Sequence, residues 1–179
     1  MGTATRYSCT VASPVGPLTL VTDGTAIVEL SWDGDRNDHQ PSLARGAAAD
    51  PTHPVLAQAV RELEEYFAGE RRAFEVGVGA AGTEFQQRAW QVLRSIPYGE
   101  TISYGEQARR LGNPRAMRAV GGANGRNPVG IIVPCHRVIG ADGSLTGFGG
   151  GVDVKRWLLD HEQAVLNALP QVAALTRPR

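Results

Sequence analysis

The sequence predicts an α/β chain in two parts, a small antiparallel sheet with one helix followed by a helical part that contains a helix-turn-helix. Short segments rich in β-branched residues alternate with turn residues over residues 6–32, whereas apolar residues recur at helical spacing from residue 54 onward. The charge also changes sign along the chain. Residues 1–82 carry six arginines and eleven carboxylates, whereas residues 83–140 carry eight arginines and three carboxylates.

Three strands are expected at the start of the chain. Residues 6–12, 17–21 and 26–32 are rich in Thr, Val, Ile, Leu and Tyr. The segments between them, 13–16 and 23–24, contain the Pro, Gly and Asp residues that favour tight turns. Consecutive strands joined by tight turns pair antiparallel, so this region predicts a meander.

A loop and a helix are expected next. Residues 33–53 are rich in Asp, Pro, Ala and Gly, which predicts a loop. Pro54 suits the first turn of a helix, and Gly69 suits its end. This first half has no paired carboxylates, histidine clusters or glycine-rich phosphate loops, so we expect it to have a structural role. The apolar stripe of the helix consists of Leu56, Val60, Leu63 and Phe67.

The second part begins with a helix that Thr83 and Gln86 start as a capping box and that residues 97–99 end. Ser103 and Glu106 form another such pattern, which predicts a short helix through Leu111. These patterns predict two helices that follow one another in the sequence. The apolar positions of the first helix are Phe85, Ala89, Val92, Leu93 and Ile96.

A tight turn is expected at Gly112-Asn113-Pro114, with Pro114 in the first turn of the following helix. Two short helices around such a turn make a helix-turn-helix. Residues 116–123 of the second helix are mostly Ala, Gly and Val, and several arginines flank them. Small residues indicate either tight packing against another helix or close approach to DNA, and the arginines favour DNA.

Residues 131–138, Ile-Ile-Val-Pro-Cys-His-Arg-Val, carry the strongest chemical signal. The apolar residues 131–133 predict a buried strand, which Pro134 ends just before Cys135. A neighbouring imidazole or guanidinium lowers the pKa of a cysteine thiol, so Cys135 is the candidate nucleophile. A buried, inert cysteine is the alternative.

Composition excludes several classes of protein. The N-terminus lacks the apolar stretch of a signal peptide, and no 18-residue apolar run is present to span a membrane. The two cysteines, Cys9 and Cys135, lie far apart, so neither a disulfide framework nor a zinc ribbon is indicated. A reducing, cytoplasmic location is expected.

Several motifs of the second part resemble those of the O-6-alkylguanine-DNA alkyltransferases, also called methylated-DNA-protein-cysteine methyltransferases. The resemblance is strong over residues 83–162 and weaker over residues 13–18 and 66–69. It implies a ribonuclease H-like α/β domain at residues 1–78, a winged helix-turn-helix-like alkyltransferase domain at residues 83–165, and a C-terminal tail at residues 166–179. The motifs that carry it are Pro134-Cys135-His136-Arg137-Val138, Ile96-Pro97-Tyr98-Gly99-Glu100-Thr101, Ser103-Tyr104-Gly105, Arg118-Ala119-Val120-Gly121 and Asn127-Pro128.

This resemblance implies direct DNA repair in a single turnover. Cys135 would take the alkyl group from oxygen-6 of guanine, with O-4-alkylthymine as a further candidate substrate. His136 would deprotonate the thiol through water, and Glu162 would orient the imidazole. Asn127 would brace the turn that holds the cysteine. The alkyl pocket would be lined by Phe148, Val138 and Gly130.

The resemblance also implies that the second helix of the helix-turn-helix enters the minor groove of duplex DNA and that the damaged nucleotide is flipped out. Arg118 would fill the vacated stack, and Tyr104 would displace the phosphate. Ser103 and Asn113 would contact the DNA backbone, and Arg115 would also bind the DNA. The protein would act as a monomer, without a membrane.

Two departures from the family pattern affect these expectations. Phe148 stands where members usually have tyrosine, so the range of alkyl groups accepted is open. Cys9 is the only cysteine in the first part, without the zinc ligands of some relatives, so no metal and no cofactor are expected. Two other functions remain: a lesion sensor that binds alkylated DNA without transfer, and a cysteine hydrolase that regenerates its thiol.

Overall fold

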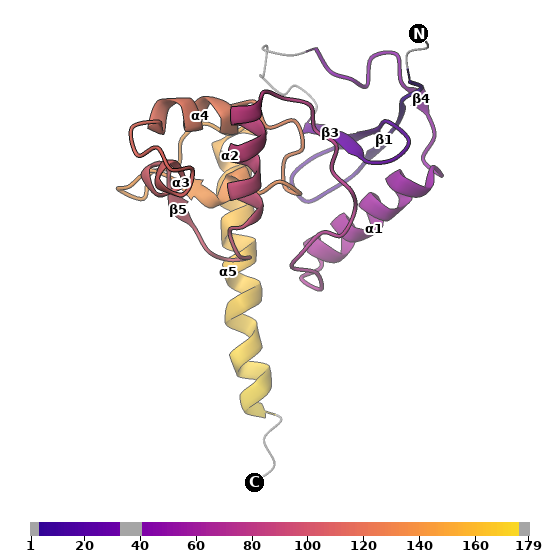
Figure 1. The fold of residues 1–179 in the computed structure, drawn as a ribbon. Helices are drawn as coiled ribbons and strands as arrows, with labels where there is room; N and C mark the ends of the chain where they lie inside the picture. Colours follow the sequence, from indigo (N-terminus) through magenta and orange to yellow (C-terminus); the bar gives the residue numbers. More distant parts are fainter. Residues whose placement is uncertain (1–3, 33–40, 176–179) are drawn as a thin grey trace.

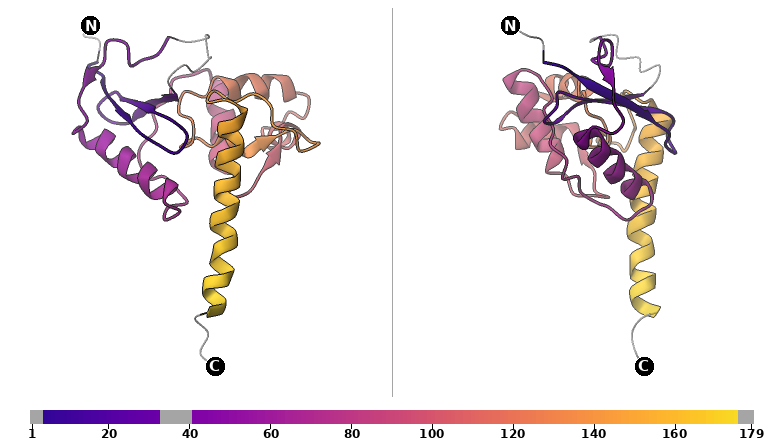
Figure 2. Two further views of the ribbon diagram at one scale, coloured as in Figure 1. Left: turned by 180° about the vertical axis from the view of Figure 1, so that it is seen from behind. Right: turned by 90° about the vertical axis from the view of Figure 1, so that its right-hand side faces the viewer.

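The computed structural model describes the backbone of residues 4–32 and 41–175, and the side chains through residue 169. Its first part is a sheet with α1 packed beside it, and its second part gathers α2, α3 and α4 around one end of the long helix α5 (Figure 1). Views from behind and from the side show α5 extending well beyond the rest of the molecule (Figure 2). The predicted two-part α/β architecture is confirmed.

The sheet has the strand order β3-β2-β1-β4. Strands β1 (Tyr7–Val11), β2 (Leu18–Thr22) and β3 (Ile27–Trp32) form the predicted antiparallel meander. Strand β4 (Ala48–Ala49) pairs parallel to β1, within the segment predicted as a loop. The described part of that segment, residues 41–53, therefore adds a short edge strand, whereas residues 33–40 lie outside the described residues.

Helix α1 (Pro54–Phe67) begins at the predicted proline, with His53 as its N-cap. At two positions the buried residue is the one before the residue that the apolar stripe predicted. Ala59 and Tyr66 are fully buried, whereas Val60 and Phe67 lie at the margin of the core. This shift brings Tyr66 toward the second part of the chain.

Helix α2 (Glu84–Arg94) starts with the predicted capping box, in which Thr83 and Gln86 exchange side-chain and backbone hydrogen bonds. Helices α3 (Tyr104–Arg110) and α4 (Met117–Gly125) follow. A reciprocal pair of buried amide hydrogen bonds joins Gln107 to Asn124, at 2.9 and 2.7 Å. This pair fixes the angle between the two helices of the predicted helix-turn-helix.

The start of α4 differs from the prediction, which placed Pro114 in the first helical turn. Residues 113–116 form a turn instead, in which the Asn113 side chain accepts a hydrogen bond from the Arg115 amide and the Ala116 amide donates to the Asn113 carbonyl. An asparagine side chain that bonds the backbone two residues later stabilises a turn in competition with a helix. The helix therefore begins three residues later, at Met117.

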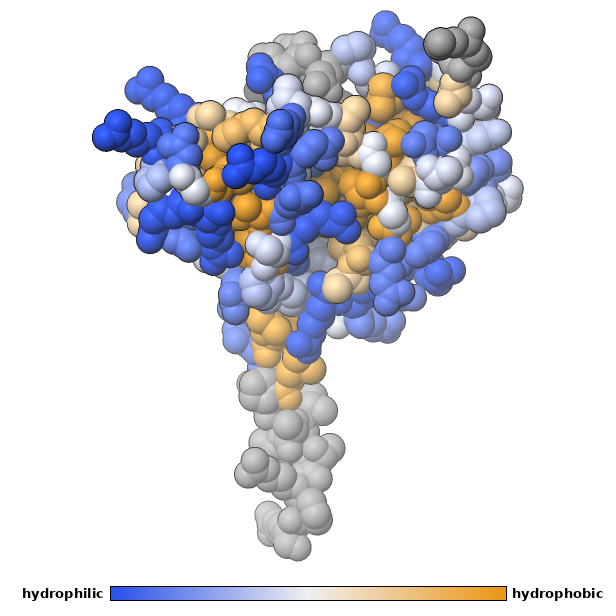
Figure 3. Space-filling view, viewed as in Figure 1, coloured by the Kyte–Doolittle hydropathy of each residue, from blue (hydrophilic) through white to orange (hydrophobic). Residues whose placement is uncertain are grey.

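A short parallel pair, β5 (Ile102–Ser103) and β6 (Val138–Ile139), lies between the helix-turn-helix and α5 (Val152–Leu175). The boundary predicted between residues 165 and 166 lies inside α5. Apolar surface, coloured orange in Figure 3, continues along this helix below the body of the molecule. Leu169 of α5 is 43% exposed. No helix among the described residues has the length and apolar character needed to cross a membrane.

Candidate active site

Cys135 begins the single-turn helix η1 (Cys135–Arg137), at the end of a buried turn. The strand predicted for residues 131–133 is wrong, because these residues form turns. Ile131 has a φ of 69°, and the Cys135 amide donates to the Val133 carbonyl at 2.8 Å. The apolar run indicated burial correctly, but a short apolar run does not by itself determine the backbone conformation.

Asn127 braces this turn from within. Its side-chain amide donates to the Val133 carbonyl at 2.8 Å, and its side-chain oxygen accepts from the Val129 amide at 3.0 Å. Strand β3 supports the same turn from the first part of the chain, because the Leu30 amide donates to the Pro128 carbonyl at 2.8 Å. The turn that presents Cys135 is therefore tied at both ends.

His136 and Glu162 form a fully buried pair, both with 0% exposure, in which Nε2 and Oε1 lie 2.9 Å apart. A carboxylate only accepts hydrogen bonds, so Nε2 carries the proton and the neutral ring has a lone pair at Nδ1. Among the described residues, Nδ1 is one of the few buried polar atoms without a hydrogen-bond partner. This nitrogen is available to accept a proton.

Burial lowers the pKa of His136, and it outweighs the opposing effect of the Glu162 carboxylate. The imidazole is therefore neutral in the resting protein at neutral pH. A neutral imidazole with one nitrogen fixed by a carboxylate has the arrangement of a general base. The adjacent residue, Cys135, is only half-buried, so the candidate nucleophile is partly accessible from outside.

The Glu162 carboxylate accepts several hydrogen bonds besides that of His136. Arg137, which is 6% exposed, donates to it from Nη2 at 2.8 Å and from Nε at 3.1 Å. The Tyr66 hydroxyl donates at 2.9 Å, and the Gly99 amide donates at 3.1 Å. Burial raises the pKa of this carboxyl, but the hydrogen bonds and charges of His136 and Arg137 together hold it at about 2.

Two partners in this cluster were missed by reasoning from the sequence. Arg137 was expected only to lower the pKa of the neighbouring thiol, and its contacts with Glu162 were not predicted. The signal was present, because an arginine inside an otherwise apolar run requires a buried anion as its partner. Tyr66 had no such signal, since a tyrosine in an amphipathic helix is ordinarily part of the core.

Lys155 is a third missed residue. It is 1% exposed, and its ammonium group donates to the Val138 carbonyl at 2.6 Å and to the Thr146 carbonyl at 3.1 Å. Burial lowers the pKa of Lys155, while the charge of Cys135 acts in the opposite direction. A buried cation therefore ties β6 to the loop that follows it, within electrostatic range of the candidate nucleophile.

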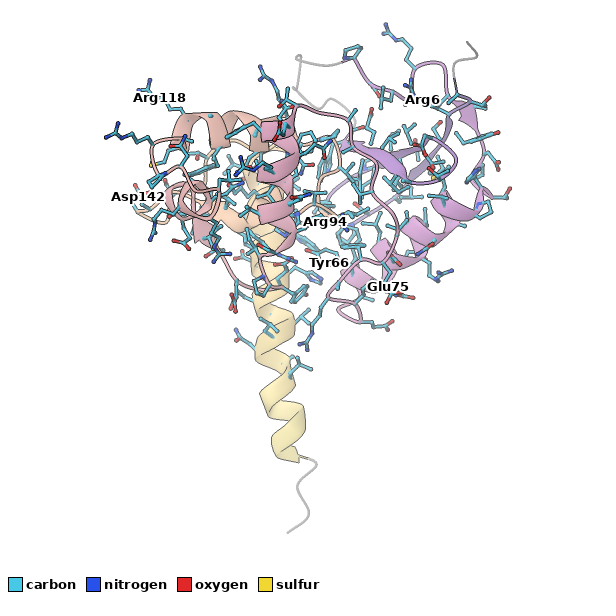
Figure 4. The ribbon with its side chains drawn as sticks, viewed as in Figure 1. Arg6, Tyr66, Glu75, Arg94, Arg118 and Asp142 are labelled. Carbon is cyan, nitrogen blue, oxygen red and sulfur yellow. The ribbon has the colours of Figure 1, made fainter. Side chains whose placement is uncertain are left out.

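Helix α4 presents small residues to open space. Among the described residues, a Cβ atom added at Gly122 or Gly125 would meet no heavy atom within 4 Å, and one added at Gly121 would only touch the Tyr104 ring at 4.0 Å. Packing inside the protein therefore does not explain these glycines. Arg118 lies on the same helix, is exposed, and points away from the body of the molecule (Figure 4).

The sequence matches two family descriptions of 6-O-methylguanine DNA methyltransferase, the ribonuclease-like domain over residues 6–79 and the DNA binding domain over residues 84–164. The chain belongs to this family. It is 50% identical over 155 residues to the methylated-DNA–protein-cysteine methyltransferase of Mycobacterium tuberculosis (strain ATCC 25618 / H37Rv), covering 87% of this chain and 91% of the relative. For the Haemophilus influenzae protein of the same name the identity is 44% over 152 residues, covering 84% and 83%.

Solved structures from the family have the same fold. The crystal structure of M. tuberculosis O6-methylguanine methyltransferase superposes with a TM-score of 0.80 at 48% identity, covering 89% of this chain and 93% of that one. The structure of M. tuberculosis OGT in complex with DNA gives a TM-score of 0.80 at 49% identity, covering 89% and 94%. These likenesses confirm the predicted fold class.

The remaining DNA-binding candidates of the family pattern lie around the helix-turn-helix. Ser103 caps α3 by accepting from the Glu106 amide, and Tyr104 begins α3 with its hydroxyl 3.3 Å from the Thr146 carbonyl. Asn113 and Arg115 are exposed in the turn before α4. The structure thus brings Tyr104 next to the loop after β6, and it leaves the two turn residues on the surface.

The three residues assigned to the alkyl pocket lie near the turn that holds Cys135. Val138 is fully buried in β6, and Phe148 is half-buried in the loop before α5. Trp32 of β3 packs edge-on against Phe148, with ring centroids 5.3 Å apart. A Cβ atom added at Gly130 would come within 2.9 Å of the Trp32 ring. Trp32, in the first part of the chain, therefore packs against two of the three pocket candidates.

Metal ligands were not expected in this chain. Among the described side chains, those of residues 4–32 and 41–169, no group of three or more His, Cys, Asp or Glu is arranged to hold a metal ion. The buried carboxylate Glu62 of the first part accepts from the Glu75 and Val76 amides at 3.1 Å, which is a structural use of its charge.

Proposed function

We propose that this protein repairs DNA directly, by transferring an alkyl group from oxygen-6 of guanine to the sulfur of Cys135. The observation that carries this proposal is the buried His136–Glu162 pair, 2.9 Å apart, beside a half-buried cysteine. The names of the relatives support it, since they are methylated-DNA–protein-cysteine methyltransferases. O-4-alkylthymine presents the same kind of alkylated oxygen and is proposed as a second substrate.

The proton and the alkyl group can each be followed from one molecule to the other. Nδ1 of His136 accepts the thiol proton, directly or through a water molecule, while Nε2–H stays bonded to Glu162. The thiolate of Cys135 forms a bond to the alkyl carbon as the bond from that carbon to guanine oxygen-6 breaks. The displaced guanine then takes up the proton held by His136, so that thioether and unmodified guanine are the products.

This transfer ends after one turnover. A thioether is a poor leaving group, and the second cysteine of the chain is unsuited to receive the alkyl group. Cys9 lies in β1 at 9% exposure, and burial raises the pKa of its thiol. A thiol that stays protonated is a weak nucleophile.

Stoichiometric repair is the first testable prediction. With excess O-6-methylguanine DNA, each protein should gain the mass of one methylene unit, and product should stop at one equivalent of active protein. Intact-protein mass spectrometry with peptide mapping to Cys135 measures both. Cys135→Ser should bind the same DNA without gaining mass, because a hydroxyl is far harder to ionise than a thiol. Product beyond one equivalent would favour a hydrolase, and binding without transfer in the wild type would favour a lesion sensor.

The helix-turn-helix is proposed to bind duplex DNA through the minor groove, with the damaged nucleotide flipped toward Cys135. The open glycines of α4 support this, because they allow the helix backbone to approach another molecule closely. Minor-groove proteins that insert a side chain into the base stack share this strategy. Ser103, Asn113 and Arg115 are proposed to contact the DNA backbone, and Tyr104 to displace the phosphate.

Arg118 is proposed to fill the stack that the flipped base leaves. Arg118→Ala should slow repair of a paired lesion by about tenfold or more, because flipping from intact duplex costs a few kcal/mol. Transfer from free O-6-benzylguanine, which needs no flipping, should change little. Single-turnover rates on the two substrates measure the difference.

Arg115→Ala is the matched control for Arg118. It removes one arginine from the same surface, so binding to damaged and undamaged DNA should weaken equally. The slope of the logarithm of the binding constant against the logarithm of salt concentration should decrease by about one. A loss of equal size on duplex lesions and on free base for Arg118→Ala would indicate a damaged fold or active site instead of a stacking role.

The division of labour along the chain is also proposed. Residues 1–78 are the α/β N-terminal domain, residues 83–165 are the DNA-binding alkyltransferase domain, and residues 166–179 are a C-terminal tail into which α5 continues as far as Leu175. The family matches at residues 6–79 and 84–164 support the first two boundaries. The protein is proposed to act as a monomer in the cytoplasm, where a reducing environment keeps the acceptor thiol reduced.

A further inference from the structure

Tyr66 joins the first part of the chain to the catalytic cluster. It lies in the last turn of α1, at the junction with the helical part (Figure 4). Its hydroxyl donates to Oε1 of Glu162 at 2.9 Å, and both side chains have 0% exposure. The contact spans 96 residues of sequence.

The oxygen that Tyr66 bonds is the one that holds His136. Oε1 of Glu162 accepts from Tyr66, from Nε2 of His136 at 2.9 Å and from Nη2 of Arg137 at 2.8 Å. Each donor draws negative charge toward itself, so the donors compete for the same oxygen. The strength of the bond to His136 therefore depends on whether the Tyr66 hydroxyl is present.

The Tyr66 side chain is fixed by its own surroundings. The rings of Phe67, Phe74 and Tyr98 surround it, with centroids 5.3, 5.6 and 6.0 Å away, and its backbone carbonyl lies 2.8 Å from Nε2 of His161. Burial and the negative charge of Glu162 raise the pKa of its phenol, so the hydroxyl remains protonated. A rigid, permanently protonated donor suits a positioning role.

We propose that Tyr66 is a positioning residue for alkyl transfer, which holds the Glu162 carboxylate against His136 and limits the negative charge that the imidazole meets. The first part of the chain then contributes a hydrogen bond to the proton-accepting machinery, in addition to supporting the fold. The role in transfer rests on the function proposed above, whereas the effect on the pKa of His136 can be measured in the protein without substrate.

Several other groups act on this pair. Arg137 faces Glu162 from η1, Tyr98 lies near Glu162 and Arg137 in the turn after α2, and Lys155 acts on His136 from α5. All of them remain in a Tyr66→Phe variant, which removes one oxygen and keeps the ring. A change in His136 in that variant therefore reports the missing hydrogen bond.

The chain offers a matched control in Tyr98→Phe. Tyr98 belongs to the same aromatic cluster, and its ring lies 5.6 Å from the Arg137 guanidinium. Among the described residues, its hydroxyl is buried without a hydrogen-bond partner. This variant therefore removes a buried phenolic oxygen from the same place without removing a bond to Glu162.

The decisive experiment is a pH titration of His136 by NMR in protein labelled with 15N-histidine, with His136→Asn identifying the signals. Tyr66→Phe should raise the pKa of His136 by about 0.5 to 1 unit, because more charge on Oε1 stabilises the imidazolium. Tyr98→Phe should leave it within about 0.2 unit of wild type. Thermal melts identify any variant that fails to fold.

The rate of transfer from free O-6-benzylguanine supplies the second readout. In Tyr66→Phe the acid limb of the pH–rate profile should shift to higher pH, and rates at pH values below the limb should fall by about three- to tenfold. An unchanged or lowered pKa of His136, or equal shifts in both variants, would overturn the positioning role. A raised pKa in a protein that transfers no alkyl group would leave that role standing and refute the proposed function alone.

Discussion

Replacing Glu162 with alanine is expected to destabilise the folded protein by about 3 to 5 kcal/mol, the usual loss when one partner of a buried ion pair is removed. The reason is the charge that stays behind. Arg137 is 6% exposed, and without Glu162 its guanidinium would be buried with no anion to balance it. Urea unfolding should measure the free energy, and the melting temperature should fall by about 6 to 20 °C.

Glu106→Ala is the control for this substitution. Glu106 also pairs with two arginines, Arg109 at 2.6 Å and Arg110 at 3.1 Å, but on the surface of α3. Exposed pairs of this kind contribute about 0 to 1 kcal/mol. Equal losses in the two variants would mean that burial of the Glu162 cluster does not matter to stability.

The stabilisation by Glu162 should also depend on pH. The pKa of its carboxyl is about 2 in the folded protein, below the ordinary value of 4.5. A carboxyl whose pKa is lowered by folding contributes its full stabilisation above its unfolded pKa and loses it as the pH falls toward the folded pKa. The stability difference between wild type and Glu162→Ala should therefore shrink as the pH falls from about 4.5 to about 2.

Alkylation of Cys135 is expected to lower the stability of the protein by about 1 to 3 kcal/mol, the range for adding atoms to a packed interior. Cys135 itself is half-buried, but the chain on either side is not, since Val133 is 2% exposed and His136 is fully buried. The Asn127 hydrogen bonds hold the turn against expansion. The melting temperature should fall by about 2 to 12 °C on methylation, and further on benzylation.

Thermal melts before and after reaction check this effect. Cys135→Ser incubated with the same alkyl donors is the control, and its midpoint should stay constant because it has no acceptor thiol. An unchanged or raised midpoint for the alkylated wild type would show that the site accommodates its product without strain.

Local chemistry explains which parts of the fold could be predicted. The strands of the meander and the caps of α1 and α2 depend on residues within a few positions of one another, such as Thr83 with Gln86. The sequence pattern did not predict the backbone conformation correctly at two places. The Asn113 side chain stabilises a turn where Pro114 favoured a helix, and residues 131–133 are buried as turns, which composition cannot separate from a strand.

The sequence by itself determined the candidate nucleophile and its base, because Cys135 and His136 are adjacent and covalent connectivity keeps them together. The family resemblance also named Glu162 as the group that orients the imidazole, but only the tertiary structure decided that Glu162 is shared with Tyr66 and Arg137. Glu162 meets His136 across 26 residues and Tyr66 across 96, and such contacts form only when α1, η1 and α5 pack against one another. Buried charges need partners, but many distant residues can supply them, so the packing of the core selects which ones do.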